Sequence, residues 1–186
     1  MADAALKSAL VDHLLKHSVR VGDFTLKSGK KSKYFIDSKQ TACRPDGMLL
    51  VARAVLELVP DDATAIGGLT MGADPVAYAT ATYAATVGRE LKAFSVRKEV
   101  KDHGGGGRIA GALDAGDRVV LTEDTASRGT SILEAANAVR DAGAEPVLML
   151  ALVDRGGTAA GYAKEAGIPF VAVITGPDLG FDYDGA

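Results

Sequence analysis

The chain has 186 residues, a length typical of one domain with a sizeable hydrophobic core. Hydrophobic residues make up 47% and charged residues 24%, as in ordinary globular proteins, and the formal net charge of −3 argues against a general affinity for nucleic acid. The single cysteine, Cys43, excludes an internal disulfide framework, and because the sequence has neither an apolar signal segment nor about 18 uninterrupted apolar residues, we expect a cytoplasmic protein that does not enter a membrane.

Hydrophobic periodicity predicts alternating helices and strands along the chain. The first helix spans about residues 4–17, and a hairpin with a turn at residues 28–30 follows within residues 24–37. Further helices are expected at about residues 46–58, 74–87, 130–142 and 158–166, and strands at about 64–68, 91–96, 117–122, 146–153 and 169–174. This alternation predicts an α/β fold, with a mostly parallel central sheet flanked by helices, in a single domain over residues 1–186. The residues after Pro177 form either a short tail or a closing strand, and the sequence leaves this open.

The expected hairpin combines cations with aromatic residues. It carries four lysines, among them Lys27, and has the aromatic pair Tyr34 and Phe35 on its return strand. By composition alone, four lysines on a hairpin are typical of a solvated face. A flat anion would also suit this setting, because an aromatic ring can stack on it and a cation can pair with a carboxylate.

A glycine-rich turn is expected at residues 67–75, between a strand and a helix that has Pro75 in its first turn. The glycines and Thr70 predict a turn that faces a phosphate. The turn contains no lysine, so backbone N–H groups would have to supply the missing positive charge.

A basic loop follows the strand at residues 91–96. Its cationic residues fall within seven positions and are Arg97, Lys98, Lys101 and His103. Four glycines at residues 104–107 come next, and because ordering such a run is entropically unfavourable, we expect a flexible loop at about residues 97–110. The loop could close over a polyanion and exclude water, or it could be a hairpin tip whose cations only keep the protein soluble.

The segment at residues 119–131 is the most informative of the chain. An apolar strand end at residues 119–121 is followed by Glu123 and Asp124, and then by small and hydroxylated residues that lead into a helix. Free N–H groups and the helix dipole at such a junction can bind a phosphate, and the two acids can accept hydrogen bonds from ribose hydroxyls or help to place a cation. The alternative is a capped strand–helix junction with exposed acids.

A run of seven apolar residues at 147–153 predicts a buried parallel strand, which ends in Asp154 and Arg155. Ligands of open α/β sheets bind beyond the carboxyl ends of the strands, so Arg155 could reach the site, and its planar guanidinium suits a carboxylate. The alternative is a surface ion pair between Asp154 and Arg155.

Four of these segments resemble a known family, among them the hairpin at residues 24–37, which resembles its hood segment, and the strand that ends in Asp154 and Arg155. Residues 119–131 resemble the 5-phosphoribosyl 1-pyrophosphate (PRPP) motif of type I phosphoribosyltransferases, and the basic loop resembles the catalytic loop of orotate phosphoribosyltransferases. The resemblance covers about residues 6–176 and implies the type I phosphoribosyltransferase fold, with a small N-terminal hood mainly at residues 18–40. It implies the transfer of the 5-phosphoribosyl group of PRPP to N1 of orotate, giving orotidine 5′-phosphate and pyrophosphate in de novo pyrimidine synthesis.

The resemblance also implies three sets of site residues. The catalytic residues would be Lys101, His103 and Asp124. The PRPP-binding residues would be Arg97, Lys98, Lys101, His103, Glu123, Asp124, Thr125, Ala126, Ser127, Arg128, Gly129, Thr130 and Ser131. The orotate-binding residues would be Lys27, Tyr34, Phe35, Ser127 and Arg155. In one respect the chain departs from many family members, which carry a Tyr-Lys pair after the first core strand; its lysine helps to hold the pyrophosphate.

Mg²⁺ is the implied cofactor, held mainly by substrate and water without direct protein ligands. Family members are homodimers in which the loop of one subunit reaches the site of the other, so a homodimer is expected. Two rival functions remain open. A phosphoribosyltransferase for a purine or uracil would keep residues 119–131 but would not need Lys27 and Arg155. A PRPP-sensing regulator that binds RNA would keep the fold, lose the loop and show a broad basic face.

Overall fold

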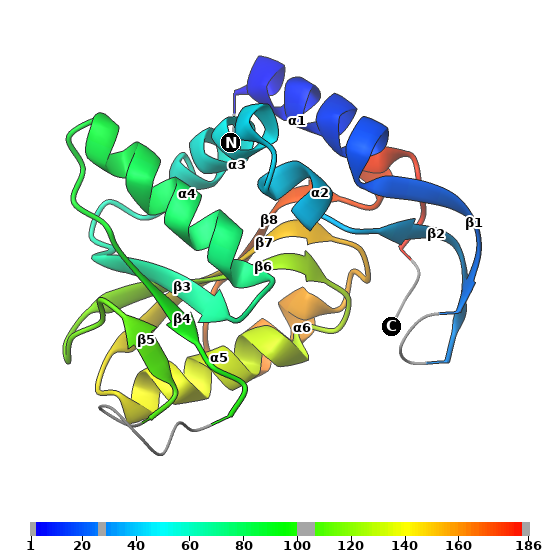
Figure 1. Ribbon diagram of the computed structural model, residues 1–186. Helices are drawn as coiled ribbons and strands as arrows, with labels where there is room; N and C mark the ends of the chain where they lie inside the picture. Colours follow the sequence, from blue (N-terminus) through cyan, green and yellow to red (C-terminus); the bar gives the residue numbers. More distant parts are fainter. Residues whose placement is uncertain (1–2, 26–28, 100–106, 184–186) are drawn as a thin grey trace.

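A six-stranded sheet forms the centre of the computed structural model, which describes residues 3–25, 29–99 and 107–183 (Figure 1). The strand order is β5-β4-β3-β6-β7-β8. The strands are β3 (Ala65–Leu69), β4 (Lys92–Val96), β5 (Ile109–Gly111), β6 (Arg118–Ala126), β7 (Glu145–Asp154) and β8 (Phe170–Thr175). All neighbours pair in parallel except β4 and β5, which are antiparallel. The prediction of an α/β fold with a mostly parallel sheet is therefore confirmed.

Helices cover both faces of this sheet (Figure 1). One face is covered by α1 (Ala4–His17), α3 (Pro45–Leu56) and α4 (Ala73–Thr86), and the other by α5 (Thr130–Asp141) and α6 (Ala159–Glu165). Successive side chains of a strand point to opposite faces, so Val120 packs with the first group and Val119 and Leu121 pack with α5. Burial on both sides explains the continuous apolar runs of the central strands. None of the helices in the described ranges has the length and apolar character that a membrane span requires.

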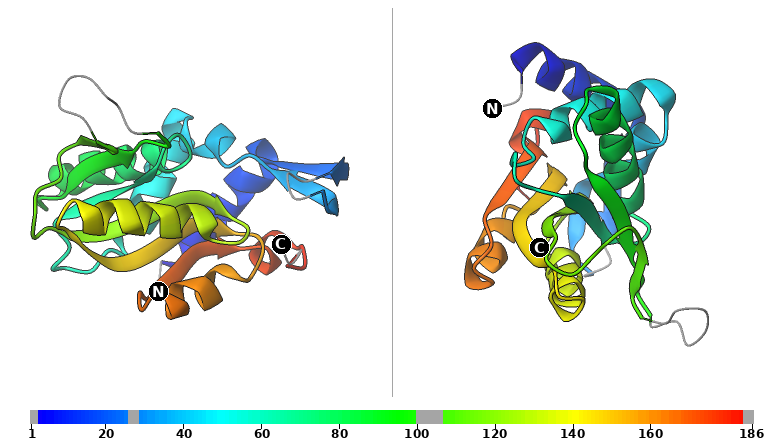
Figure 2. Two further views of the ribbon diagram at one scale, coloured as in Figure 1. Left: turned by 90° about the horizontal axis from the view of Figure 1, so that it is seen from below. Right: turned by 90° about the vertical axis from the view of Figure 1, so that its left-hand side faces the viewer.

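The N-terminal hairpin forms a separate two-stranded antiparallel sheet of β1 (Val19–Thr25) and β2 (Lys31–Ile36). Figure 2 shows it projecting beyond the end of the central sheet. The first strand begins at Val19, earlier than the predicted start at Phe24, because Val19 already pairs with Ile36. The hairpin is therefore longer than its alternating sequence pattern indicates.

The structure also contains elements that the sequence pattern did not predict. These are α2 (Lys39–Ala42), the short strand β5, and a 3-10 turn at Pro177–Leu179. Strand β6 continues four residues past its predicted end because its backbone remains paired with β7, up to Ala126 opposite Asp154. After the 3-10 turn, residues 181–183 have no strand pairing, so the described part of this segment is a tail and not a closing strand.

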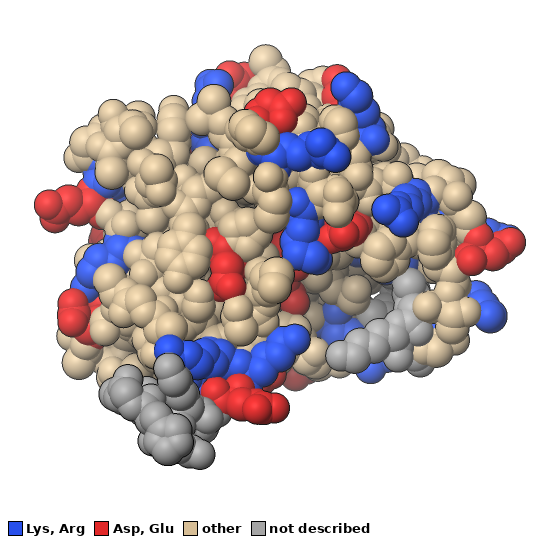
Figure 3. All heavy atoms as spheres, in the orientation of Figure 1, with Lys and Arg blue, Asp and Glu red and all other residues tan. Residues whose placement is uncertain are grey.

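Charged side chains of both signs are interspersed on the face seen in Figure 3, where a largely uncharged area lies over α4. Only one residue of α4, Asp74, is charged. The broad basic face expected of an RNA-binding regulator is not visible from this side.

Candidate active site

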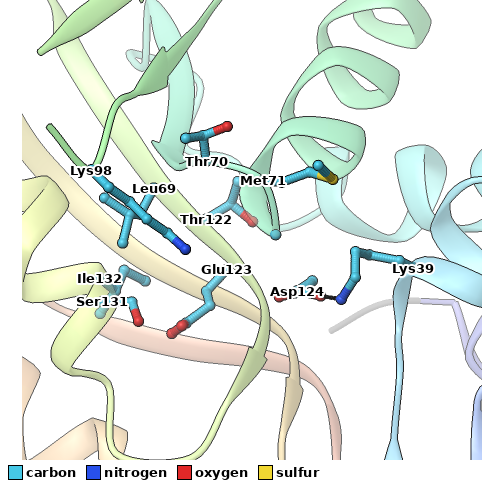
Figure 4. A pocket seen from close by; sticks show the side chains of 11 residues that line it. Lys39, Leu69, Thr70, Met71, Lys98, Thr122, Glu123, Asp124, Ser131 and Ile132 are labelled. Carbon is cyan, nitrogen blue, oxygen red and sulfur yellow. Dashed lines mark hydrogen bonds and ion pairs between the residues drawn. The ribbon is translucent and has the colours of Figure 1, made fainter. Parts of the chain in front are cut away.

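A pocket of about 500 Å³ opens where β3 and β6 end (Figure 4). It is lined by Lys39, Leu69, Thr70, Met71, Gly72, Lys98, Thr122, Glu123, Asp124, Ser131 and Ile132. The chain leaves β3 for β4 on one side, whereas β6 lies on the other side of β3. The pocket therefore lies at the point where the strand order reverses, which is where open α/β sheets bind their ligands.

Two neighbouring acids at the end of β6 have different surroundings. Burial raises the pKa of Glu123 to about 7, helped by the charge of Asp124 and opposed by a hydrogen bond with Ser131. Asp124 instead accepts a hydrogen bond at 3.2 Å from the ammonium group of Lys39, and its side chain is only 13% exposed. Near neutral pH the pocket thus holds one carboxyl group that can exchange its proton and one that is paired with a cation.

Glycines allow the turn after β3 to approach β6 closely. A Cβ atom on Gly68 would lie 2.2 Å from the backbone oxygen of Thr122, and a Cβ atom on Gly72 would lie 2.4 Å from Asp124 Oδ1. Any larger residue at either position would displace its neighbour. The glycines predicted to form a phosphate-facing turn therefore bring the backbone of this turn next to the acids.

Hydrogen bonds hold the same turn against α4 and β4. Thr70 Oγ1 donates to Asp74 Oδ2 at 2.6 Å, and Ser95 Oγ donates to Asp74 Oδ1 at 2.7 Å. Asp74 lies at the start of α4, so its two carboxylate oxygens connect the turn after β3 to α4 and to β4. The 67–75 turn expected from the sequence lies in the pocket; its binding of phosphate stays a prediction.

The hydroxyl-rich segment after the acids leads into α5. Gly129 has a φ of 81°, a conformation that favours glycine, and Ser131 in the first turn of the helix lines the pocket. The first N–H groups of a helix have no partners within it, so this end can bind an anion. Arg128 and Thr130 are exposed, and the methyl group of Ala126 is buried in an apolar cluster, which leaves only its backbone to contact a ligand.

The basic loop is described only at its two ends. Lys98 lines the pocket, whereas Arg97 folds back, with Nη1 3.4 Å from the backbone oxygen of Ile109. Arg108 donates to the backbone oxygen of Arg97 at 2.8 Å and forms an ion pair with Glu134 of α5. The stem of the loop is thus fixed to the sheet and to α5.

Three of the predicted site residues lie outside the described residues. They are Lys101 and His103 of the loop and Lys27 of the hairpin.

Ser127 and Arg155, both expected to bind orotate, come from adjacent segments. The backbone N–H of Arg155 donates to Ala126 O at 2.9 Å, and Thr158 Oγ1 donates to Ser127 O at 3.0 Å. The contact is so close that a Cβ atom on Gly156 would lie 1.8 Å from Ser127 O. The structure therefore brings these two segments together, and the binding of orotate by Ser127 and Arg155 stays a prediction.

The side chain of Arg155 is buried against the hairpin. Its Nη2 donates to Ser32 Oγ at 3.0 Å and to the backbone oxygen of Tyr34 at 3.1 Å, and its guanidinium carbon lies 4.8 Å from the Tyr34 ring centre. The Tyr34 ring stacks on Phe181 at 4.3 Å, and its hydroxyl donates to Asp182 O at 3.1 Å. The tail, the hairpin and the end of β7 thus hold Arg155 in place.

The aromatic pair of the hairpin does not share one face. Tyr34 is buried, whereas Phe35 is 38% exposed on the opposite side of β2 and lies 5.7 Å from the ring of Phe24. Alternation along a strand explains this separation. The two rings therefore do not form one joint surface, and contact of either ring with orotate stays a prediction.

Sequence reasoning missed the segment that joins the hairpin to α3. Lys39 Nζ lies 2.9 Å from Asp37 Oδ1 and 3.2 Å from Asp124 Oδ2, and Ser38 Oγ lies 2.5 Å from Thr125 Oγ1. The only local signal was a short polar stretch after a strand, which is typical of many loops. Its contact with the acids of β6 depends on the tertiary fold.

Known proteins resemble this chain over nearly its whole length, although no protein-family model matches it. The orotate phosphoribosyltransferase of Streptomyces avermitilis is 41% identical over 179 residues, which cover 95% of this chain and 98% of the relative. The orotate phosphoribosyltransferase of Nostoc sp. is 38% identical over 177 residues, or 95% and 86% of the two chains. The structure of Mycobacterium tuberculosis orotate phosphoribosyltransferase in complex with 5-phospho-alpha-D-ribosyl 1-diphosphate has a TM-score of 0.80 and 34% identity, and the match covers 95% of this chain and 99% of that chain.

Proposed function

The chain belongs to the orotate phosphoribosyltransferase family, and on that premise we propose which of its residues carry out the reaction. The enzyme is a pentosyltransferase of pyrimidine biosynthesis. It transfers the 5-phosphoribosyl group of PRPP to orotate and gives orotidine 5′-phosphate and pyrophosphate. The observation that carries the residue assignments is the pocket that combines the acids of β6, the N-terminus of α5 and the glycine turn after β3.

PRPP is proposed to occupy this pocket along its length. Its 5-phosphate binds the N–H groups and hydroxyls of residues 125–131, where α5 begins. The ribose 2- and 3-hydroxyls lie on Glu123 and Asp124, which can accept their hydrogen bonds, and the protonated form of Glu123 can also donate one. The pyrophosphate faces the turn at residues 69–72 and Lys98, where backbone N–H groups and a cation are available.

The chemical step needs positive charge at the leaving group. The bond from ribose C1 to pyrophosphate breaks and its electron pair leaves with pyrophosphate, while N1 of orotate releases its proton to water and forms the new bond to C1. Donors fixed at the leaving oxygens stabilise charge that develops only in the transition state. We assign this role to Lys101 and His103, with Lys98 and Arg97 at the near end of the same loop in support.

Orotate is proposed to bind between Ser127 and Arg155. The guanidinium group presents parallel N–H donors that suit the orotate carboxylate, and its contacts with Ser32 and Tyr34 fix its orientation. Lys27 and Phe35 of the hood would complete this part of the site.

Mg²⁺ is the metal that we propose for the reaction. The donors that the pocket offers are the two adjacent carboxyl groups of Glu123 and Asp124, and within the described ranges no group of three or more His, Cys, Asp or Glu side chains could hold a metal. This set suits Mg²⁺, which keeps several waters and takes further oxygens from the phosphates of a substrate. When bound, the ion would neutralise part of the charge on PRPP.

A homodimer is proposed to form through the groove between α3 and α4. The groove has a volume of about 360 Å³ and is lined mainly by apolar residues, including the exposed side chains of Met48, Leu49 and Tyr78. It borders the active site, because Tyr78 contacts Ser95 at 3.0 Å in the network that holds the turn at residues 69–72. Exposed apolar surface of this kind is typical of an interface. The loop of each subunit is proposed to reach the pocket of the other.

A cytoplasmic location is part of the same proposal. The single cysteine, Cys43, is a free and exposed thiol, which suits a reducing compartment. The negative net charge and the mixed surface charges favour small-molecule substrates over nucleic acid or membranes.

The decisive assay for the function uses purified protein with PRPP, Mg²⁺ and orotate. We expect the absorbance of orotate to fall as pyrophosphate is released in equal amount. Parallel reactions with adenine, hypoxanthine and uracil should show no comparable turnover. Turnover with one of these bases but not with orotate would transfer the assignment to a different phosphoribosyltransferase, and binding of PRPP without any turnover would favour a regulator.

A further inference from the structure

Two lysines point into the PRPP pocket from opposite sides (Figure 4). Lys98 comes from the basic loop and was expected there. Lys39 comes from α2, and its ammonium group lies between Asp37 Oδ1 at 2.9 Å and Asp124 Oδ2 at 3.2 Å. The side chain of Lys39 is 41% exposed, so it can reach both the protein and a bound ligand.

The 69–72 turn itself brings no cation to the pyrophosphate, and among the described residues Lys98 approaches from the side opposite Lys39 (Figure 4). The turn itself contains no lysine, and the nearest charged side chain on β6 is Asp124, whose Oδ1 closely approaches Gly72. A diphosphate brought to this side would meet backbone N–H groups and a carboxylate. Lys39 is the charge that can offset this repulsion.

The shared carboxylate fixes the place of Lys39 relative to the turn. Asp124 approaches Gly72 through Oδ1 and accepts from Lys39 through Oδ2. The ammonium group is therefore attached to the same carboxylate that touches the turn. The proposed 5-phosphate site lies elsewhere, at the start of α5, where Ser131 lines the pocket.

The ammonium group also has the capacity for a further partner. A lysine side chain has three N–H donors, and Asp37 and Asp124 use two of them among the described residues. Burial lowers the pKa of Lys39, but hydrogen bonds and charge from Asp37 and Asp124 outweigh burial and raise it above its ordinary value. The group is thus charged throughout the neutral range.

We propose that Lys39 binds the pyrophosphate part of PRPP, and so supplies the cation that the 69–72 turn lacks, while it remains bonded to Asp124. This inference rests on the proposed function and deepens it, because it assigns a substrate contact to a residue outside the loop and outside residues 119–131. It also explains how a turn without lysine can take part in binding a diphosphate.

The test compares three ligands on Lys39→Met in the presence of Mg²⁺. Titration calorimetry with PRPP and with pyrophosphate should show affinities roughly 10–100-fold weaker than those of the unmodified protein, the range expected when a hydrogen bond to a charged group is lost. Binding of ribose 5-phosphate, which has no diphosphate, should change by less than about 3-fold. Unchanged pyrophosphate affinity overturns the proposal. An equal loss for ribose 5-phosphate also overturns it, because Lys39 would then act only through Asp124.

Lys7→Met is the matched control. Lys7 is 39% exposed and pairs with Asp178 at 2.8 Å, so it resembles Lys39 in exposure and in having a carboxylate partner, but it lies on α1 and does not line the pocket. All three affinities should stay within about 2-fold, as for an exposed ion pair. A loss for Lys7→Met equal to that for Lys39→Met would reduce the effect to overall charge and contradict the proposal.

A second variant guards against loss of structure. Thermal unfolding shows whether Lys39→Met is folded, and Lys39→Gln keeps a polar side chain, one bond shorter than lysine, while removing its charge. The Gln variant should show the same selective loss for the two diphosphate ligands.

Orotate turnover of the unmodified protein is measured separately. If the unmodified protein shows no turnover, the proposed function is contradicted. If it is active and both Lys39 variants bind pyrophosphate as tightly as it does, only the role of Lys39 is contradicted.

Discussion

The floor of the pocket is part of the central sheet, whereas its rim is formed by segments outside that sheet that are tied to it largely through side chains. The floor consists of Glu123 and Asp124 on β6 together with the 69–72 turn, where strand pairing and close glycine contacts fix the geometry. The rim consists of the hairpin and the loop after β4, which are tied down by contacts such as those of Arg155 with Ser32 and of Arg108 with Glu134. The acids proposed to orient the ribose thus belong to the central sheet, whereas Lys98 and Arg97, proposed to support the leaving group, lie at the described end of the loop.

The largest effect should come from the rim, with Lys101→Ala. The turnover number should fall by roughly 10²–10³, as when one donor to a developing anion is removed. The free energy of unfolding should stay within about 0.5 kcal/mol, as for surface substitutions. Steady-state kinetics and denaturant unfolding measure the two quantities, with Lys164→Ala on the exposed side of α6 as a control that should alter neither. An unchanged turnover number rejects the role of Lys101.

A smaller effect on rate, accompanied by some loss of stability, is expected from the floor with Gly72→Ala. The added methyl would lie 2.4 Å from Asp124 Oδ1 and must push this carboxylate away from its place. We expect kcat/KM to fall by roughly 10–100-fold and stability to fall by about 1 kcal/mol. Gly161→Ala is the control, since a Cβ atom there meets no atom within 4 Å. Full activity of the Gly72 variant would show that the position of Asp124 is not critical.

The third effect concerns the buried acid of the floor, and it appears in the pH dependence of stability and not in the rate. The pKa of Glu123 is raised from 4.5 to about 7 in the folded protein, mainly by burial, so the folded state holds this proton more tightly than the unfolded state. Stability associated with Glu123 is therefore complete below about pH 4.5 and is lost as the pH rises towards 7. Replacing it by Gln removes this dependence.

Urea unfolding of Glu123→Gln at pH 5 and at pH 8 measures the difference. Relative to the unmodified protein, the variant should gain about 2 kcal/mol between these two pH values. Equal pH dependence in both proteins would mean that Glu123 titrates normally. Glu123 would then not differ from Asp124 in holding its proton near neutral pH.

Local patterns in the sequence were enough to predict most of the fold. Continuous apolar runs such as residues 147–153 identified the buried strands because these strands are covered on both faces. The end of β6 was placed too early, because the charges of Glu123 and Asp124 look like the start of a loop while the backbone stays paired with β7. Strand β5 was missed because it has only three residues.

The site divides in the same way. The acids, Ser131 and Lys98 follow from local motifs, and all of them line the pocket. Lys39 could not be predicted, since its partner Asp124 is 85 positions away and the contact exists only once the chain has folded. Local motifs therefore identified residues that line the pocket, whereas contacts between distant segments, including the one that holds Asp124, required the structure.

The most direct measurement of the central claim is a crystal structure of the protein with PRPP and Mg²⁺. The ribose hydroxyls should lie on Glu123 and Asp124, with the 5-phosphate at residues 125–131 and the pyrophosphate at the 69–72 turn. PRPP bound outside this pocket, or bound with its two phosphate ends exchanged, would contradict the account.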